Sequence, residues 1–245
     1  MAQDAGDCCA LRGRIKRVLD FAKAHGQRMG ENPARWKGHL DSILPPRQKL
    51  YRGHLKAMPF FDVPAFMTQL RGMKGIAPRA LEFTILTAAR SGEARKTSWD
   101  EMDLEAKLWT IPAGRMKGAR EHRVPLSPRA VAILREMAKV RESQLVFPGL
   151  KRDYPLSDMT LTAVLRRSRI DVTVHGFRSS FRDWAAECTN FPREVCEMAL
   201  AHLVGSDVER AYARGDLLLK RRRLMDNWAQ FCSSHDAGTV VVLRA

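Results

Sequence analysis

The stretch HGFRSSFRDWAAE, residues 175–187, carries apolar residues at the spacing of an α-helix from Phe177 onward. His175 and Arg178 stand three positions apart, which on a helical turn places both side chains on one face. An arginine can grip two phosphate oxygens at once, and a histidine can exchange a proton near neutral pH. A solvated histidine and arginine on a basic helix would show the same spacing. The stretch therefore predicts a helix, and its chemistry has to be decided by the rest of the chain.

Helical spacing recurs on both sides of this stretch. Further helices are predicted at Leu11–Ala24, Val63–Arg71, Pro78–Arg90, Arg129–Val140, Asp158–Ser168, Pro192–Ala201, Asp207–Arg214 and Leu217–Phe231. The pattern changes to three short strands around Trp99, at Leu108–Ile111 and at Arg123–Leu126, with a glycine-bearing turn over Pro112–Ala119. We therefore predict an α+β fold, mainly helical with one small antiparallel sheet.

The chain divides by pattern into three parts. Residues 1–57 hold one amphipathic helix and a proline-broken, basic stretch, which we interpret as a truncated helical segment with a linker, too short to bury a core of its own. Residues 58–235 form the main domain. Residues 236–245 are a tail whose β-prone run, Gly238–Leu243, could pair with another chain or pack against its own.

The charge of the chain favours a polyanion as its partner. Lys and Arg number 42 against 27 Asp and Glu, which gives a net charge of +15. Nucleic acid is favoured over a membrane, because the longest apolar runs are far shorter than a spanning helix. The first ten residues do not resemble a signal peptide, so a cytoplasmic protein is expected. Five cysteines without C-x-x-C spacing indicate neither a disulfide framework nor a metal site.

Two common chemistries of DNA processing lack their motifs. The chain has no G-x-x-x-x-G-K-[ST] loop for ATP, and its acidic residues show no local spacing typical of a two-metal site, although scattered carboxylates could still converge in space. A mechanism without metal or ATP needs a side-chain nucleophile, cations and an acid. Tyr212 follows a helix-capping pattern, Ser206-x-x-Glu209, but a packing tyrosine would fit there equally well.

The order of several motifs resolves these ambiguities. In chain order they are Thr87-Ala88-Ala89-Arg90-Ser91-Gly92-Glu93, Trp99-Asp100-Glu101-Met102-Asp103, a hairpin with Lys117, His175-Gly176-Phe177-Arg178, Leu200-Ala201-His202 and Tyr212. Over residues 58–235 the chain resembles the tyrosine recombinase (phage integrase) family. The sequence of residues 181–187 and 214–225 is most similar to sequences of the satellite-phage and genomic-island branch.

The resemblance implies a role for each motif residue. Tyr212 would be the nucleophile that forms a 3′-phosphotyrosyl bond, and its ester would store the energy for resealing, so no cofactor is expected. The other implied roles are phosphate clamping by Arg90 and Arg178, a hydrogen bond to the phosphate from His202, proton removal from Tyr212 by His175, protonation of the leaving oxygen by Lys117, and orientation of these groups by Glu93. Arg115 and Arg120 are alternative cations beside Lys117.

The resemblance also implies partners. They are double-stranded DNA attachment sites, a homotetramer on two paired duplexes, and accessory proteins that bend DNA. The departure from the family is the short region before Pro45, which resembles only the last third of a helical DNA clamp. A resolvase or type IB topoisomerase-like enzyme, and a DNA-binding regulator or decoy without strand exchange, stay open as alternatives.

Overall fold

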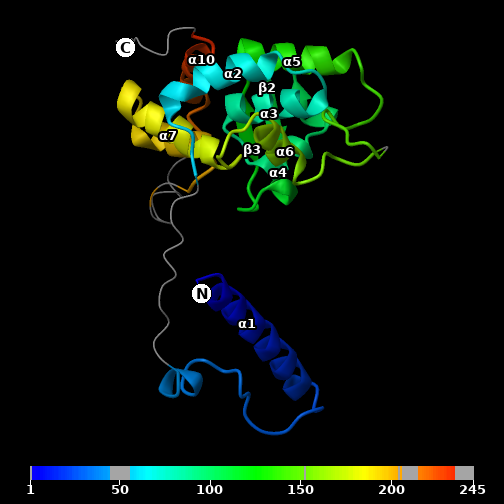
Figure 1. Ribbon diagram of the computed structural model, residues 1–245, viewed down its shortest axis with the longest axis vertical. Coiled ribbons are helices and arrows are strands. Elements are labelled where there is room, and N and C mark those ends of the chain that lie inside the picture. Colours follow the sequence, from blue (N-terminus) through cyan, green and yellow to red (C-terminus); the bar gives the residue numbers. More distant parts are fainter. Residues whose placement is uncertain (1, 45–55, 152, 204, 206–214, 235–245) are drawn as a thin grey trace. The chain divides into compact units, whose positions relative to one another are not determined.

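The computed structural model describes residues 2–44, 56–151, 153–203, 205 and 215–234 (Figure 1). The predicted nucleophile Tyr212, the predicted helix Asp207–Arg214 and the tail 236–245 lie outside these residues. The chain forms two compact units, Met1–Gly53 and His54–Ala245.

The first unit contains one long helix, α1 (Ala2–Ala24), and a single 3₁₀ turn, η1 (Leu40–Ser42). The helix begins nine residues earlier than the predicted Leu11. Asn32 is buried and its amide donates to the Lys16 carbonyl at 2.9 Å, which holds the following loop against α1. The apolar side chains of α1 are nevertheless exposed, namely Leu11, Ile15, Val18 and Phe21. This unit therefore buries little apolar surface within its described residues.

The second unit is built around the helix α3 (Ile76–Thr87), most of whose residues are buried. Figure 1 shows α3 in the middle of this unit, and it packs against α2, α4, α5, α6 and α10. The surrounding helices are α2 (Val63–Arg71), α4 (Ser91–Arg95), α5 (Pro128–Ala138), α6 (Thr160–Arg167), α7 (Gly176–Cys188), α8 (Arg193–Ala199) and α10 (Leu218–Phe231). A helix that is apolar on nearly every face must be covered on every side, and the surrounding helices cover α3 in this way.

A three-stranded antiparallel sheet lies at the edge of this helical unit. Its strands are β1 (Met102–Asp103), β2 (Leu108–Ile111) and β3 (His122–Pro125), paired in the order β1-β2-β3. Trp109 faces Val124 in the register, and both side chains are buried. The predicted fold class, mainly helical with a small antiparallel sheet, is confirmed. The β2–β3 connection carries Lys117.

Several predicted bounds of the second unit are off by one or two residues, and two of its predicted elements are wrong in kind or length. Trp99 does not lie in a strand but begins a 3₁₀ turn, η3 (Trp99–Glu101), and the strand starts only at Met102. The predicted helix Pro78–Arg90 ends at Thr87, because Ala88 turns into the left-handed region with φ 49°. A new short helix, α4, then starts after Arg90.

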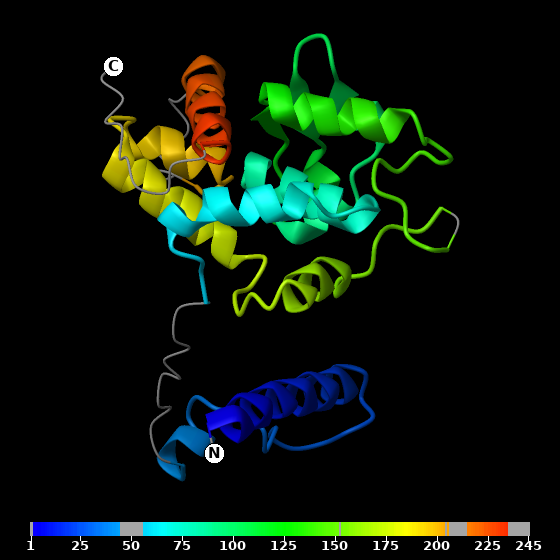
Figure 2. The ribbon, with the colours of Figure 1, turned by 45° about the horizontal axis from the view of Figure 1, so that its top comes forward.

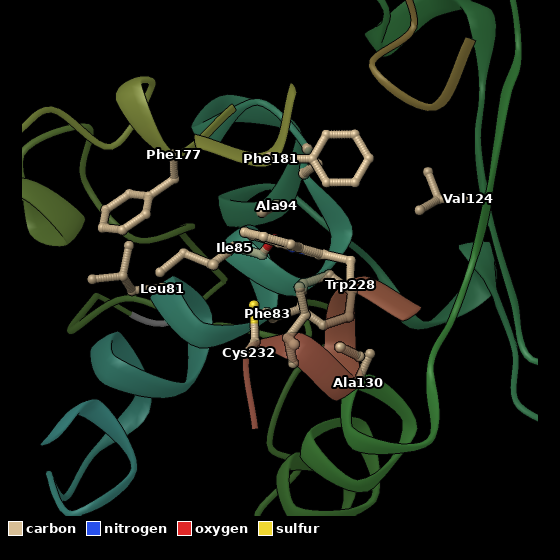
Figure 3. Packing of buried hydrophobic residues seen from close by; sticks show 14 of the residues in the cluster. Leu81, Phe83, Ile85, Ala94, Val124, Ala130, Phe177, Phe181, Trp228 and Cys232 are labelled. Atoms are coloured by element: carbon tan, nitrogen blue, oxygen red, sulfur yellow. The ribbon is translucent and has the colours of Figure 1, made fainter. Parts of the chain in front are cut away.

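An aromatic cluster joins the last helix to the rest of the core. The Trp228 indole of α10 lies with its ring centroid 5.0 Å from that of Trp184 and 5.5 Å from that of Phe181, both on α7. Its Nε1 donates to the Ile85 carbonyl of α3 at 2.9 Å, so the buried indole N–H is satisfied. Figure 2 shows α10 beside α7, and Figure 3 shows Trp228 among the side chains it covers. Burial of these rings fixes the helices from which the site residues come.

Among the described residues, no helix is long and apolar enough to cross a bilayer.

Candidate active site

Arg178 lies at the centre of the candidate site. Its side chain comes from the first turn of α7 and is 5% exposed. One terminal nitrogen, Nη1, donates to the Ala88 carbonyl at 2.5 Å, and the other, Nη2, donates to the Leu200 carbonyl at 2.6 Å. These carbonyls stand at the C-terminal ends of α3 and α8, where the helix dipole leaves partial negative charge. The ends of two helices thus hold one buried guanidinium.

Left-handed turns produce these carbonyl positions. Ala88, after α3, has φ 49°, and Ala201, after α8, has φ 52°. A residue with a Cβ is uncommon in this region and costs roughly 1–2 kcal/mol there, so the surrounding structure must hold it. Each turn also starts a segment with a predicted site residue, Arg90 after Ala88 and His202 after Ala201. The same bends therefore bind Arg178 and bring Arg90 and His202 beside it.

His202 joins Arg178 to a carboxylate. Its Nε2 lies 3.2 Å from Arg178 Nη2, and its Nδ1 lies 2.6 Å from an oxygen of Glu197 on α8. The carboxylate of Glu197 also accepts from Arg182 Nε at 2.8 Å. Burial raises the pKa of Glu197, but the hydrogen bonds from His202 and Arg182 outweigh it and hold that pKa below its ordinary value. Glu197 is therefore ionised at neutral pH.

Arg90 is held by a carboxylate rather than by carbonyls. Arg90 Nη1 donates to Glu93 Oε1 at 2.7 Å, and the Arg90 backbone N–H donates to Glu93 Oε2 at 2.9 Å. Arg90 precedes the first residue of α4 and Glu93 lies in its first turn, so one carboxylate caps the helix and fixes the arginine. Glu93 is 6% exposed. Glu93 is placed to orient Arg90.

His175 is exposed and stands immediately before α7. Partial burial lowers the pKa of His175, and the charges of Arg178, Arg90 and His202 lower it further. A lowered pKa favours the neutral imidazole at pH 7, and a neutral imidazole can accept a proton. The same cations that would bind a phosphate thus keep His175 ready to act as a base.

Gly176 between His175 and Phe177 is required by a close approach of backbone. A Cβ at this position would come within 2.3 Å of the Lys56 carbonyl oxygen and 2.8 Å of the Ala57 Cα. The Thr173 N–H donates to the same Lys56 carbonyl at 3.0 Å. The start of α7, with the two site residues His175 and Arg178, is therefore packed directly against residues 56 and 57.

The β2–β3 hairpin is anchored next to Arg90. Arg115 pairs with the Glu101 carboxylate, and its Nη2 donates to the Glu93 carbonyl at 2.5 Å. Trp109 Nε1 donates to Glu101 at 2.9 Å, so this buried carboxylate joins the sheet to the hairpin. Of the three neighbouring cations, Arg115 is engaged in structure, whereas Lys117 and Arg120 are exposed. Lys117 is better placed than Arg115 to meet a ligand.

A cavity of about 400 Å³ lies between the hairpin and His202. Gly118, next to Lys117, and Asp216, four residues after Tyr212, are among its lining residues. Asp216 accepts two hydrogen bonds from Arg123 of β3, at 2.8 and 2.9 Å, and one from the buried Arg221 of α10 at 2.6 Å. The chain is thereby fixed to β3 shortly after Tyr212. Five of the seven predicted residues, Arg90, Glu93, His175, Arg178 and His202, interact with one another.

The model of the phage integrase family matches residues 57–216, which is more than half of the chain. The chain belongs to the phage integrase family.

Two curated relatives show the branch of the family. Prophage integrase IntA of Escherichia coli K12 is 40% identical over 162 residues, 64% of this chain and 39% of that protein. The integrase of Enterobacteria phage P4 is 32% identical over 241 residues, 89% of this chain and 53% of that protein. The predicted resemblance to the satellite-phage and genomic-island branch is confirmed by these prophage and satellite-phage relatives. The chain spans roughly half the length of such integrases or less.

A solved structure supports the fold. A lambda integrase dimer bound to a COC′ core site, comprising its residues 75–356, is similar with a TM-score of 0.57 at 16% identity. The similarity covers 82% of this chain and 73% of that one. At this identity the similarity shows the integrase fold alone.

Three residues of the candidate site were not predicted from the sequence, namely Glu197, Asp216 and Arg221. Glu197 lies five residues before His202, and the two meet only because α8 ends in the left-handed turn at Ala201. Five residues is not a spacing at which side chains meet on a helix, so the pattern gave no signal for this pair. Arg221 was within a cationic run on α10, and its burial could not be read from that run.

Proposed function

We propose that this chain is the catalytic part of a site-specific DNA recombinase that breaks and rejoins DNA through a 3′-phosphotyrosyl intermediate. The observation that carries the proposal is the environment of Arg178. Its hydrogen bonds go to two carbonyls and His202, so among the described residues no carboxylate contacts it. A buried guanidinium without a carboxylate in contact among the described residues, close to Arg90, His175 and His202, is suited to an oxyanion.

The hydrogen-bond donors of Arg178 suit a phosphate ligand. An arginine side chain has five N–H groups, and three of those of Arg178 point to Ala88, Leu200 and His202. The N–H that now faces His202 would donate instead to one non-bridging oxygen of the scissile phosphate, and Arg90 would meet another. Charge that develops on these oxygens in the transition state would then be stabilised by groups already held in place.

The proposed reaction moves one phosphoryl group and two protons. The oxygen of Tyr212 attacks phosphorus while His175, kept neutral by its neighbours, accepts the phenolic proton. The bond from phosphorus to the 5′ oxygen breaks, and Lys117 gives that oxygen a proton. A 3′-phosphotyrosyl ester and a 5′-hydroxyl result. Attack by the 5′-hydroxyl of a second DNA end reverses these steps and reseals the strand without a nucleotide cofactor.

The proposal includes partners and an architecture. The substrate would be double-stranded DNA attachment sites, bound by a homotetramer on two paired duplexes, with accessory bending proteins where the sites require them. The cell compartment would be the bacterial cytoplasm. Residues 1–57 would contribute the end of a DNA-clamping domain, residues 58–235 the catalytic domain, and residues 236–245 a tail that docks on a neighbour. The net charge of +15 supports DNA as the partner.

A suicide substrate tests the proposal. Duplexes tiled from the DNA on either side of the chain's own gene are nicked beside each candidate cut site, so that a cleaved strand diffuses away and a covalent intermediate accumulates. We expect a protein–DNA adduct on a denaturing gel with the natural chain and none with Tyr212→Phe. An adduct of equal yield from Tyr212→Phe, or no adduct on any duplex, would contradict the proposal.

The products separate recombination from related activities. Joining of two different sites identifies a recombinase, and relaxation of supercoiled DNA without joining identifies a topoisomerase-like enzyme. Binding without an adduct identifies a regulator or decoy.

A further inference from the structure

The contact between His202 and Glu197 constrains where the histidine carries its proton. An ionised carboxylate only accepts hydrogen bonds, so Nδ1 of His202, 2.6 Å from Glu197, must carry a hydrogen. A guanidinium only donates, so Nε2 of His202, 3.2 Å from Arg178, must offer its lone pair. The geometry of the free protein therefore fits the Nδ1–H tautomer of His202. This form has no hydrogen left to donate to an oxyanion.

An oxyanion bound between Arg178 and His202 changes this balance. It would take the Arg178 N–H that Nε2 now accepts, and its oxygen would face the Nε2 lone pair. Moving the hydrogen from Nδ1 to Nε2 would set the Nδ1 lone pair against the Glu197 carboxylate, which is repulsive. A second proton on Nε2 instead places an imidazolium between two anions. The His202 side chain is 42% exposed, so solvent can supply that proton.

We propose that Glu197 is a positioning residue that fixes the Nδ1–H form of His202 and makes oxyanion binding at Arg178 depend on the uptake of one proton by His202. The identity of this oxyanion as the scissile phosphate rests on the proposed function. It follows that Glu197 converts His202 from an acceptor in the free protein into a charged donor in the complex. No proton source other than solvent is needed.

The charges around His202 come from several elements. They are Glu197 and Arg193 on α8, Arg178 and Arg182 on α7, His175 before α7, and, along the shared cavity, Arg120, Glu121, His122, Arg123, Asp216 and Arg221. Most of these are cationic, and they oppose an imidazolium until an anion binds. Within the described residues, Glu197 is the carboxylate in hydrogen-bond contact with the ring. The coupling between anion and proton is therefore expected to be strong.

Histidine ring ¹⁵N spectra with sulfate as the probe test the proposal directly. Sulfate stays a dianion near neutral pH, so any proton gained is gained by the protein. In the natural chain at pH 7.5 we expect Nδ1 of His202 protonated and Nε2 unprotonated, with both protonated at saturating sulfate. The His202→Gln variant assigns the signals. A free protein with hydrogen on Nε2, or sulfate binding that leaves Nε2 unprotonated, would overturn the proposal.

Sulfate affinity gives a second readout. Because one proton is taken up, the affinity of the natural chain should fall by up to about tenfold per pH unit as the pH rises above neutral. Glu197→Gln should weaken sulfate binding about tenfold at pH 7.5, as expected for loss of one charge-assisted hydrogen bond, and should flatten the pH dependence. Arg182→Ala is the matched control, because it removes the other partner of Glu197 and leaves His202 in contact with the carboxylate.

The outcomes separate this inference from the proposed function. Proton-coupled sulfate binding without any DNA adduct would support the role of Glu197 and contradict DNA cleavage. An adduct that depends on Tyr212, together with sulfate binding that is independent of pH, would support cleavage and contradict the role of Glu197. Equal pH dependence in Glu197→Gln and in the natural chain would also overturn the inference.

Discussion

Arg178 and Arg90 lie on the same site but are held in opposite ways. Arg178 is 5% exposed and bound by backbone carbonyls, whereas the Arg90 side chain is 26% exposed and paired with the Glu93 carboxylate. Burial lowers the pKa of Arg178 to about 10, and the charge of Arg90 adds to this effect. Glu93 cancels much of the charge of Arg90. The comparison indicates that Arg178 supplies most of the positive charge that no contacting carboxylate neutralises. Arg90 mainly orients the bound phosphate.

The largest expected effect is a difference between two alanine variants. Arg178→Ala should slow adduct formation about 10³-fold, whereas Arg90→Ala should slow it about 10²-fold, the upper and lower ends of what one oxyanion donor contributes. DNA affinity should change little in either, because the donors serve the transition state. Single-turnover cleavage and a binding titration measure the two quantities. A larger loss in Arg90→Ala, or a parallel loss of affinity and cleavage in Arg178→Ala, would break the comparison.

Two glycines next to the arginines provide a matched pair. Gly176→Ala on the Arg178 side would press a Cβ into the Lys56 carbonyl, and should destabilise the fold by about 1–3 kcal/mol, as overpacking does. Gly92→Ala on the Arg90 side meets no atom within 4 Å in α4, and should stabilise the fold by up to about 1 kcal/mol through helix propensity. Thermal or urea unfolding measures both. Equal stability of the two variants would contradict the close packing at Gly176.

A smaller effect is expected when Glu93, the carboxylate that holds Arg90, loses its charge. Glu93→Gln keeps an acceptor for the Arg90 N–H groups but removes the ion pair, which is worth about 1 kcal/mol because the Arg90 partner is partly exposed. Cleavage should fall several-fold, about fivefold for that energy, and Arg178-dependent sulfate binding should persist. Cleavage rates and sulfate titrations with Glu93→Gln measure these two quantities. A loss as large as that of Arg178→Ala would show that Glu93 serves more than Arg90.

The smallest effect is a shift in one titration. Burial, then Arg178, then Arg90 lower the pKa of His175, so removal of either arginine should raise that pKa toward its ordinary value, and removal of Arg178 should raise it more. Since the lowered pKa disfavours the protonated folded state, the contribution of His175 to stability is present above its ordinary pKa of about 6.5 and is lost as the pH falls below it. NMR titration of the His175 ring in Arg178→Ala and Arg90→Ala measures the order. The reverse order would contradict the comparison.

The local sequence pattern was enough to predict elements whose apolar spacing matches their burial in the fold. The helix α2 and the strand β2 have the predicted bounds, because their apolar spacing and turn residues agree with their surroundings. The end of α3 was placed three residues too late, because nothing in Thr87-Ala88-Ala89 shows that Ala88 turns left-handed to meet Arg178. The partner that accepts this turn, Arg178, lies 90 positions away in the sequence.

The same contrast holds for the site. The motif order named five residues that interact, since their spacing reflects the family's own arrangement. Glu197 and Arg221 were missed because their importance depends on burial and on partners that only the fold brings near. Tyr212 lies outside the described residues, and its role stays a prediction.

Identifying the covalently modified residue tests the central claim most directly. The DNA of a suicide-substrate adduct is trimmed with nuclease, the protein is digested, and the peptide that carries the remaining nucleotide is sequenced by mass spectrometry. The account predicts a phosphodiester on Tyr212, formed in the natural chain and strongly reduced in Arg178→Ala. A nucleotide on Tyr51 or Tyr154, or an adduct formed at the natural rate without Arg178, would contradict it.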